Sequence, residues 1–238
     1  MKKLINRLSL SSFQEAIDVS LISTQKLRVI GFVNAHAVNM YLEDEAFADA
    51  IMSADVLFRD GIGVSFALRL FGLDPKSNNN GTDLLPRVLE VFKGKTIAII
   101  GTEDRILTDM KELLNSEYSI KNCYTMNGFD FSFEEYLEFL NIREPQMILL
   151  AMGMPKQEIF AKYLKEQYEN PSLVFNGGAI INFMTGHEKR APRVLRSIGC
   201  EWLWRLIQDP KRLYVRYIYG NSKFLFRVIK FRLLECIN

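Results

Sequence analysis

Two short stretches place glycine and polar side chains directly after hydrophobic runs. Residues 153–158 (Gly-Met-Pro-Lys-Gln-Glu) follow the run 147–151, and residues 176–178 (Asn-Gly-Gly) follow the run 173–175. A strand, a glycine turn and the start of a helix together form an anion site, because backbone N–H groups and the positive end of the helix dipole face the ligand. The two turns therefore predict a ligand that carries phosphate, such as a nucleotide.

The residues of the first turn suit this role. Gly153 lets the backbone approach a phosphate, Pro155 fits the first turn of a helix, and Lys156 and Gln157 add hydrogen-bond donors. An ordinary strand-to-helix connection with a solvated Lys156 explains the same residues equally well, so the motif alone leaves both interpretations open. The corresponding residues of the second turn are Gly177 and Gly178, for which a plain turn and a second phosphate-facing turn are equally open.

Asp60 is the candidate catalytic residue. It follows the short hydrophobic run 55–58 and precedes Gly61. A carboxylate at the end of a strand, in a partly closed cleft, can act as the general base that takes a proton from an attacking hydroxyl group. Asp-Gly is also a common turn, and the spacing alone does not separate the two roles.

Two further glycine turns carry weaker signals. Gly101, Thr102 and Glu103 follow a hydrophobic run, and they could contact a nucleoside or simply form a turn. Thr82 and Asp83 begin a predicted helix, where either residue could cap the helix N-terminus. Asp83 could instead hydrogen bond to sugar hydroxyl groups.

Hydrophobic runs alternate with helical patterns as far as residue 175. The predicted strands are 27–33, 55–58, 96–100, 120–125, 147–151 and 173–175. The predicted helices are 36–54, 63–71, one ending at 92, one ending near 115, 133–140 and 156–168. This alternation predicts an α/β fold with a Rossmann-like, mainly parallel sheet flanked by helices. Ligands in such folds bind at the carboxyl ends of the strands, where the turns at Asn34, Asp60, Gly101, Asn127-Gly128, Gly153 and Gly177 lie.

The charge distribution indicates a core followed by a basic extension. The chain has 238 residues, enough for one sizeable domain and an appendage. Residues 1–184 carry 18 Lys and Arg against 24 Asp and Glu, whereas residues 185–238 carry 12 against 4, a net charge of +8. Such a tail attracts anionic lipid, nucleic acid or an acidic partner. We expect an α/β core (1–190) and a basic, aromatic, helical C-terminal appendage (191–238).

The expected appendage has the pattern of an amphipathic helix. Between residues 222 and 237, apolar side chains share one helical face and basic side chains an adjacent one. The apolar residues are Phe224, Val228, Phe231 and Leu234, and the basic ones are Lys223, Arg227 and Lys230. The alternative is a docked helical pair whose aromatic residues belong to the core. Nucleic acid is not expected, because no recognised nucleic-acid module is visible.

Cysteine usage and hydropathy predict the compartment. Cys123, Cys200 and Cys236 are far apart and odd in number, which favours a reducing cytosol over a disulfide framework. The N-terminus is a poor signal peptide. No stretch approaches the roughly 18 uninterrupted apolar residues of a spanning helix. We expect a cytoplasmic protein that is peripheral on the inner face of the cell membrane.

Together these motifs resemble the WecG/TagA/CpsF glycosyltransferases of bacterial surface-polysaccharide synthesis. The resemblance covers about residues 27–217. Each motif is weak evidence alone, and the resemblance rests on the order and spacing of all of them. The matching pieces are Asn34 in Val-Asn-Ala-His, the segment 54–61, Gly-Thr-Asp-Leu at 81–84, the turn at 153–158, Gly-Gly at 177–178, Thr-Gly at 185–186, Arg-Ala-Pro at 190–192 and Gly-Cys-Glu-Trp-Leu-Trp-Arg at 199–205.

The resemblance implies an inverting transferase. Such enzymes transfer a sugar from a UDP-sugar, often UDP-N-acetylmannosamine or its uronic acid, to a polyprenyl-diphosphate-linked sugar at the cytoplasmic membrane face. By resemblance, Asp60 is the general base, and Asn34 and Gln157 are polar active-site residues. We expect Thr82, Asp83, Lys156 and Arg190 to contribute to substrate binding, and the turns at Gly101, Gly153 and Gly177 to form the nucleotide edge.

The arginines of the tail complete this expectation. Arg205, Arg212 and Arg216 could pair with the acceptor diphosphate, for which the guanidinium fork is suited. The expected partners are the UDP-sugar, the polyprenyl-linked acceptor and the membrane surface. The hydrophobic tail surface would suit a membrane or a subunit partner, and hence a homo-oligomer, equally well.

We expect neither a metal nor a cofactor. His36 and His187 are isolated and have no carboxylate or cysteine partner at ligand spacing, so structural or surface roles are expected for them. The Asp-x-Asp motif, with which many nucleotide-sugar enzymes bind a metal–diphosphate, is missing from the sequence. Backbone N–H groups and cationic side chains would then stabilise the departing UDP.

One position departs from the family pattern. The family usually carries an arginine shortly before the Gly-Thr-Asp element, where this chain has Lys76 as the candidate replacement. The sequence leaves open a related transferase that uses another UDP-hexose such as UDP-glucose, and a non-catalytic nucleotide-binding membrane scaffold. A Rossmann-like oxidoreductase or methyltransferase is disfavoured, because the first strand ends in Val-Asn-Ala-His and not in a Gly-x-Gly-x-x-Gly turn.

Overall fold

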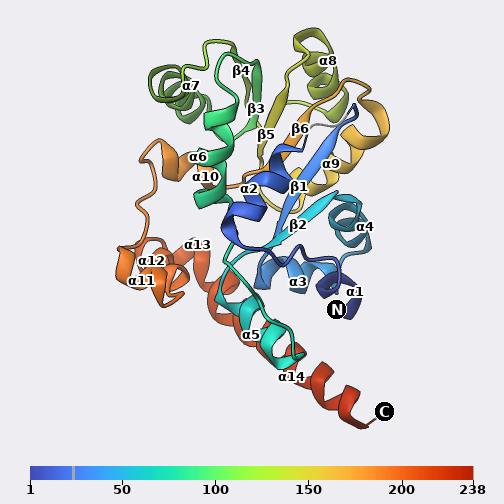
Figure 1. Ribbon diagram of the computed structural model, residues 1–238. Coiled ribbons are helices and arrows are strands. Elements are labelled where there is room, and N and C mark those ends of the chain that lie inside the picture. The colour runs from blue at the N-terminus through green and yellow to red at the C-terminus, as the bar shows by residue number, and fades with distance from the viewer. Residues whose placement is uncertain (23–24, 238) are drawn as a thin grey trace.

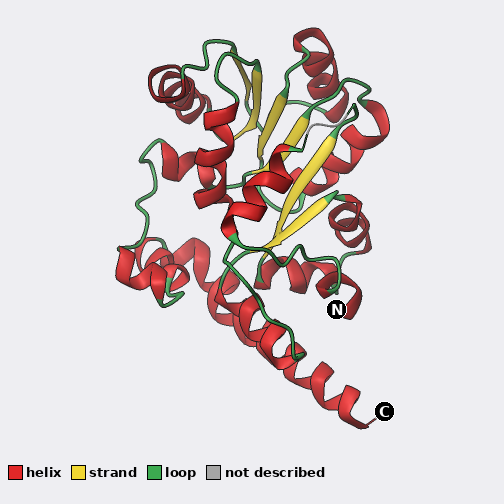
Figure 2. Ribbon diagram, in the orientation of Figure 1, coloured by secondary structure: helices red, strands yellow, loops and turns green. Residues whose placement is uncertain are grey.

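The computed structural model describes residues 1–22 and 25–237, with side chains up to residue 234, and contains a sheet of six parallel strands (Figure 2). The strand order is β2-β1-β6-β5-β3-β4. The strands are β1 (Arg28–Val33), β2 (Val56–Arg59), β3 (Ile97–Gly101), β4 (Cys123–Met126), β5 (Met147–Ala151) and β6 (Leu173–Asn176). Each predicted strand is present and every neighbouring pair is parallel, which confirms the expected α/β, Rossmann-like sheet.

Strand side chains alternate between two hydrophobic layers, one on each face of the sheet. Ile100 and Leu150 belong to one layer, and the preceding residues Ile99 and Leu149 belong to the other. All four side chains are almost completely buried. Because helices cover both faces, these strands have continuous apolar sequences rather than alternating ones, which is why simple hydrophobic runs locate them.

Different helices cover the two faces (Figure 1). The first layer packs against α1 (Lys2–Ile5), α3 (Ala35–Tyr41), α4 (Glu45–Ser53), α5 (Ile62–Leu70), α8 (Phe133–Arg143) and α9 (Lys156–Gln167). The second layer packs against α2 (Phe13–Leu21), α6 (Gly81–Val91), α7 (Asp104–Tyr118) and α10 (Ile180–Met184). The single helix expected over 36–54 is wrong. Asp44 accepts a 3.0 Å hydrogen bond from the Phe47 N–H and caps a second helix, α4.

At the carboxyl edge of the sheet, Gly101 allows β3 to end close to β5. Its φ of +141° is rarely adopted by other residues, and a Cβ atom built there would lie 2.2 Å from the carbonyl carbon of Ala151. Such an approach is far inside van der Waals contact. Gly101 therefore has a packing role at this edge.

The C-terminal part of the chain is helical. Its elements are α11 (Arg193–Ser197), α12 (Glu201–Gln208), α13 (Pro210–Tyr214), the π-helical turn η1 (Val215–Tyr219) and α14 (Gly220–Ile237). In Figure 1, α14 runs beside α5 and away from the sheet toward the C-terminus. The helix also packs against α3. Within the described residues, no helix is both long enough and apolar enough to cross a membrane.

The first half of α14 is docked on the core. Phe224 and Val228 are buried, and Lys223 and Arg227 both form ion pairs with Glu43. The docked-helix interpretation therefore describes this half better than a free interfacial helix does, because the predicted apolar and basic faces are already occupied there. Large apolar side chains on the remaining surface of α14 are exposed, and these are Leu225, Phe226, Ile229, Phe231, Leu233 and Leu234.

Candidate active site

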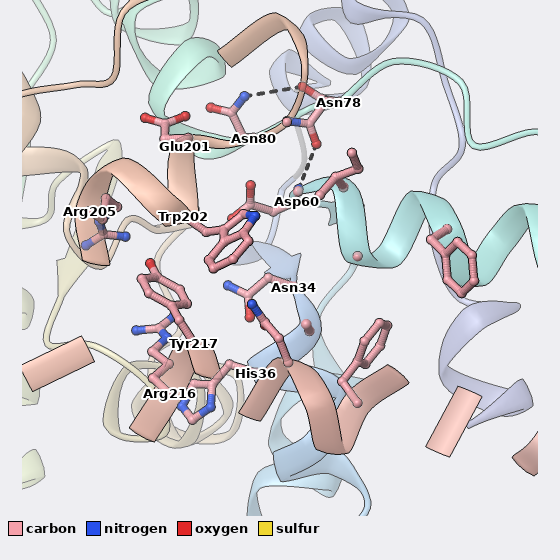
Figure 3. A pocket seen from close by; sticks show the side chains of 18 of the residues that line it. Asn34, His36, Asp60, Asn78, Asn80, Glu201, Trp202, Arg205, Arg216 and Tyr217 are labelled. Carbon is pink, nitrogen blue, oxygen red and sulfur yellow. Dashed lines mark hydrogen bonds between the residues drawn. The ribbon is translucent and has the colours of Figure 1, made fainter. Parts of the chain in front are cut away.

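Two cavities open at the carboxyl edge of the sheet and meet at Asp60. The glycine-turn cavity, of about 300 Å³, is lined by the turns after β3, β5 and β6. The C-terminal cavity, of about 370 Å³, lies between the ends of β1 and β2 and the helices α12 and α14 (Figure 3). The residues that line both cavities are Asn34, Asp60, Thr82, Phe183, Arg205 and Arg216. Groups bound in the two cavities would therefore approach each other beside Asp60.

Strand pairing and a buried arginine fix the backbone around Asp60. The Asp60 N–H extends the β1–β2 ladder with a 2.8 Å hydrogen bond. Arg59, the last residue of β2, donates to two carbonyl oxygens of the loop 74–80 and to Asn78 Oδ1. Asn78 Oδ1 also accepts from the Gly61 N–H at 2.8 Å. The polar loop is thereby held against the strand end that carries Asp60.

Lys76, the candidate replacement for the family's arginine, lies away from both cavities. Its Nζ pairs with Asp74 at 3.0 Å, and its side chain is 54% exposed. A guanidinium reaches the C-terminal cavity from Arg196 on α11 instead. Lys76 therefore does not place a positive charge in either cavity.

The surroundings of Asp60 favour its protonated form. Burial raises the pKa of Asp60 above its ordinary value, and the negative charge of Glu201 raises this pKa further. The Asn34 side chain, by hydrogen bonding to the carboxylate, and the positive charges of Arg216 and Arg205 oppose the rise in pKa. An aspartate whose pKa is moved toward neutral pH is a more effective proton acceptor.

His36 lines the C-terminal cavity close to Asp60. Burial, together with the positive charge of Arg216, lowers the pKa of His36 to about 4. Its imidazole is therefore neutral at neutral pH and can donate or accept a hydrogen bond in the cavity.

The glycine turns shape the second cavity but do not present all their N–H groups to it. Thr102, Gly153, Gly177 and Gly178 line the cavity. However, the N–H groups of Gly177 and Gly178 both donate to Leu150 O, at 2.7 and 3.1 Å. Because these donors are already used, these two N–H groups are not available to an anion in this arrangement.

Gln157 is part of a buried hydrogen-bond chain. Gly153 N–H donates to Gln157 Oε1 at 3.2 Å, and Gln157 Nε2 donates to Glu158 Oε1 at 2.8 Å. Burial raises the pKa of Glu158 to about 7. The chain fixes the orientation of the Gln157 side chain, which lines the glycine-turn cavity.

Four residues expected at the nucleotide or substrate do not line either cavity: Gly101, Glu103, Pro155 and Lys156. Gly101 packs against β5, and Glu103 precedes α7. Pro155 precedes α9, and Lys156 Nζ donates to Gly128 O at 2.7 Å. These positions support the turns rather than face the cavities.

Asp83 and Arg190 also lie outside the cavity walls, because they bind each other. Arg190 Nη1 donates to Asp83 Oδ1 at 2.6 Å, and Asn80 Nδ2 donates to Asp83 Oδ2 at 2.7 Å. Both carboxylate oxygens of Asp83 are therefore occupied. Neither residue lines a cavity in this arrangement, and the substrate contact expected of them stays a prediction.

The three arginines expected from the tail converge on the glycine-turn cavity. Arg205 Nη2 and Arg212 Nη2 each lie 3.2 Å from a carboxylate oxygen of Glu188. Within the described residues, Arg216 has no carboxylate at salt-bridge distance, and its Nε is buried without a hydrogen-bond partner. Burial lowers the pKa of Arg216. An anion placed here would satisfy a buried guanidinium that the chain leaves unpaired.

Sequence reasoning did not assign a role to several residues that line the cavities. They are Phe129, Asn182, Phe183, Glu188, Glu201 and Trp202. Glu201 and Trp202 belong to the motif at 199–205, which could have identified them as candidate site residues. No sequence pattern distinguishes Phe129 or Glu188. In the described part of the chain, no group of three or more metal-ligating side chains is arranged to hold a metal ion.

The protein thus has an all-parallel sheet with two adjoining cavities at its carboxyl edge, where ligands bind in α/β folds of this kind, and one carboxylate, Asp60, in the walls of both. The model of the glycosyl transferase WecG/TagA/CpsF family matches residues 2–235, nearly the whole chain. The chain belongs to this family of glycosyltransferases, which act in cell-surface polysaccharide biosynthesis. The resemblance inferred from the motifs is confirmed.

Proposed function

We propose that this protein is an inverting UDP-sugar glycosyltransferase that acts on a polyprenyl-diphosphate-linked saccharide. N-acetylmannosamine or its uronic acid is the sugar that we expect it to transfer. One observation carries the proposal: two cavities of similar volume share Asp60 in their walls. A transferase needs two adjoining sites, for donor and acceptor, with a proton acceptor where they join.

The glycine-turn cavity suits the donor. Phe129, 66% exposed at its edge, offers a ring on which a nucleobase can stack. Arg205, Arg212 and Arg216 offer guanidinium groups for the diphosphate. These cations would stabilise the charge that develops on the departing UDP, so the proposed reaction uses no metal ion or other cofactor.

The C-terminal cavity suits the acceptor. Its walls combine polar side chains near Asp60 with apolar ones farther along α5 and α14, including Phe66 and Leu225. A lipid-linked sugar has the same polarity, with a polar head and an apolar tail. Arg205 and Arg216 also line this cavity and could pair with the acceptor diphosphate.

The proposed reaction requires Asp60 to act once. The carboxylate of Asp60 takes the proton from the acceptor hydroxyl as the hydroxyl oxygen attacks the anomeric carbon. The bond from that carbon to the UDP oxygen breaks, and its electron pair leaves with UDP. Attack from the face opposite the leaving group inverts the anomeric centre. Asn34 and Thr82, at the junction of the cavities, would orient the reacting groups.

Residues 191–238 are proposed as the appendage that brings this site to the inner face of the cell membrane. Phe226 and Leu233 are exposed, and basic side chains lie on the same helix. Apolar side chains beside basic ones favour an anionic membrane surface. The same exposed surface would also suit a second copy of the chain.

Nucleotide binding by calorimetry tests the proposal. The panel is UDP, UDP-N-acetylmannosamine, UDP-N-acetylglucosamine, UDP-glucose, GDP-mannose and NAD, each with and without EDTA. We expect the UDP compounds to bind, unaffected by EDTA. Binding of NAD alone, or loss of UDP binding with EDTA, would contradict the proposal. UDP binding without transfer would favour the scaffold alternative.

A further inference from the structure

A second carboxylate lines the C-terminal cavity besides Asp60. Glu201 is the first residue of α12, and its side chain is 30% exposed. Figure 3 shows Glu201 beside Asn80 and across from Asp60. The charge of Glu201 is one of the causes that raise the pKa of Asp60, which is consistent with a short separation between the two side chains. Glu201 does not line the glycine-turn cavity.

A chain of polar contacts holds Glu201 on one side. Its Oε1 lies 3.5 Å from Arg190 Nε, and Arg190 Nη1 lies 2.6 Å from Asp83 Oδ1. Asp83 is in turn fixed at the start of α6 by Asn80. Arg190 thus connects a carboxylate of the core to a carboxylate of the C-terminal helices. It positions Glu201 in the wall of the cavity.

Glu201 lines the cavity, and among the described residues its carboxylate has one hydrogen-bonding contact, the one with Arg190. No described group of the protein donates a hydrogen bond to Glu201 Oε2. An ionised carboxylate is an acceptor only, with several lone-pair sites. Its charge repels phosphate, whereas sugar hydroxyl groups are donors that it can bind with strong, charge-assisted hydrogen bonds.

We infer that Glu201 binds the acceptor sugar, accepting hydrogen bonds from hydroxyl groups next to the one that attacks, and that Asp83 and Arg190 position it. The inference rests on the proposed function, because it takes the C-terminal cavity as the acceptor site. Asp60 remains the proton acceptor, since it lies where the two cavities meet and Glu201 lines one cavity only. The appendage thereby supplies a specificity-determining contact, besides contacting the membrane.

Steady-state kinetics with separate variation of donor and acceptor test this role. We expect Glu201→Gln to raise the acceptor KM roughly 10- to 100-fold, as for a lost hydrogen bond to a charged group, and to leave the donor KM and UDP affinity unchanged. Glu201→Asp keeps the charge and should recover part of the loss. Arg190→Gln should raise the acceptor KM in the same direction by a smaller factor. Glu90→Gln, which removes a surface carboxylate paired with Arg87, is the matched control.

The outcomes separate this inference from the proposed function. Wild-type acceptor KM in Glu201→Gln, or an equal rise in donor and acceptor KM, would overturn the role of Glu201 while the transferase proposal stands. Wild-type protein that does not bind UDP or transfer sugar would overturn the proposed function and this inference together. If Glu201→Gln loses UDP binding through misfolding, Arg190→Gln carries the test, and an unchanged acceptor KM in that variant overturns the inference.

Discussion

The two cavities that meet at Asp60 are built from different kinds of structure. The glycine-turn cavity follows β3, β5 and β6, whose strands are buried and paired along their length. The C-terminal cavity depends on helices that are held to the core by the buried side chains Phe224 and Val228 and by partly exposed ion pairs such as Arg190–Asp83 and Lys223–Glu43. Exposed ion pairs contribute about 0–1 kcal/mol each. The proposed donor side of the site should therefore be the more rigid, and the proposed acceptor side should respond more to charge and to a membrane surface.

Asp60 belongs to both cavities, so its replacement should have the largest effect on activity. Asp60→Asn keeps the size of the side chain but removes the proton acceptor. We expect turnover to fall about 100-fold or more, while calorimetry shows UDP affinity close to that of wild type. A variant that keeps the full rate would remove Asp60 from the mechanism.

The rigidity of the donor side can be tested at two glycines. A Cβ at residue 101 would lie 2.2 Å from backbone, whereas nothing lies within 4 Å of a Cβ at residue 153. We expect Gly101→Ala to lower the free energy of unfolding by about 3 kcal/mol or more, and Gly153→Ala by about 1 kcal/mol because of its positive φ. Urea denaturation measures both. Equal losses would mean that the close approach at β5 does not limit stability.

The membrane-facing role of the acceptor side can be tested on exposed apolar residues. Phe226 is 67% exposed and Leu233 is 60% exposed on α14, and Ile142 is 67% exposed on the core helix α8. We expect the double variant Phe226→Ser, Leu233→Ser to bind anionic vesicles roughly tenfold or more weakly in flotation assays. Ile142→Ser is the matched control and should bind like wild type. Equal binding by all three proteins would argue against α14 as the anchor.

The effect of the Glu201 charge on the pKa of Asp60 predicts a smaller change, in the pH dependence of activity. The groups that face Asp60 are Glu201, which raises its pKa, and Asn34, Arg205 and Arg216, which lower it. As the pH falls through this raised pKa, Asp60 becomes protonated and kcat/KM decreases. Glu201→Gln removes a negative charge, so the acid limb of the profile should move to lower pH. If the acid limb of the pH profile is unchanged in Glu201→Gln, the charge of Glu201 does not affect the pKa of Asp60.

The same pKa has a consequence for stability. A carboxyl group whose pKa is raised by folding stabilises the native state at low pH, and this contribution is lost as the pH rises through the folded-state pKa. Asp60→Asn should therefore be more stable than wild type at neutral and higher pH, in the same urea experiment. If Asp60→Asn is less stable than wild type at neutral pH, hydrogen bonds and positive charges stabilise the ionised Asp60 more than burial destabilises it.

Local sequence patterns predicted the strands and the turns, because burial on both faces gives continuous apolar runs that end where the site begins. The division of 36–54 into two helices depends on one capping residue, Asp44, which the helical pattern does not distinguish from its neighbours. The donor groups of Gly177 and Gly178 were expected to face a phosphate, but their use by Leu150 O depends on the pairing of β5 with β6.

Contacts between distant parts of the chain could not be predicted in this way. Asp83 and Arg190 are 107 residues apart, and each looked like a substrate ligand when considered alone. Phe129 is an ordinary loop residue until the fold brings it to the edge of a cavity. Asn34 and Asp60, the candidate site residues that the structure brings to the junction of the cavities, directly follow strands.

The assignment of one cavity to the donor and the other to the acceptor is tested most directly by a matched pair of substitutions. Phe129 lines only the glycine-turn cavity and Leu225 only the C-terminal cavity. We expect Phe129→Ala to raise the donor KM about tenfold, as for a lost stacking contact, with the acceptor KM unchanged. Leu225→Ala should raise the acceptor KM and leave the donor KM unchanged. The reverse pattern, or one substrate affected by both substitutions, would contradict the account.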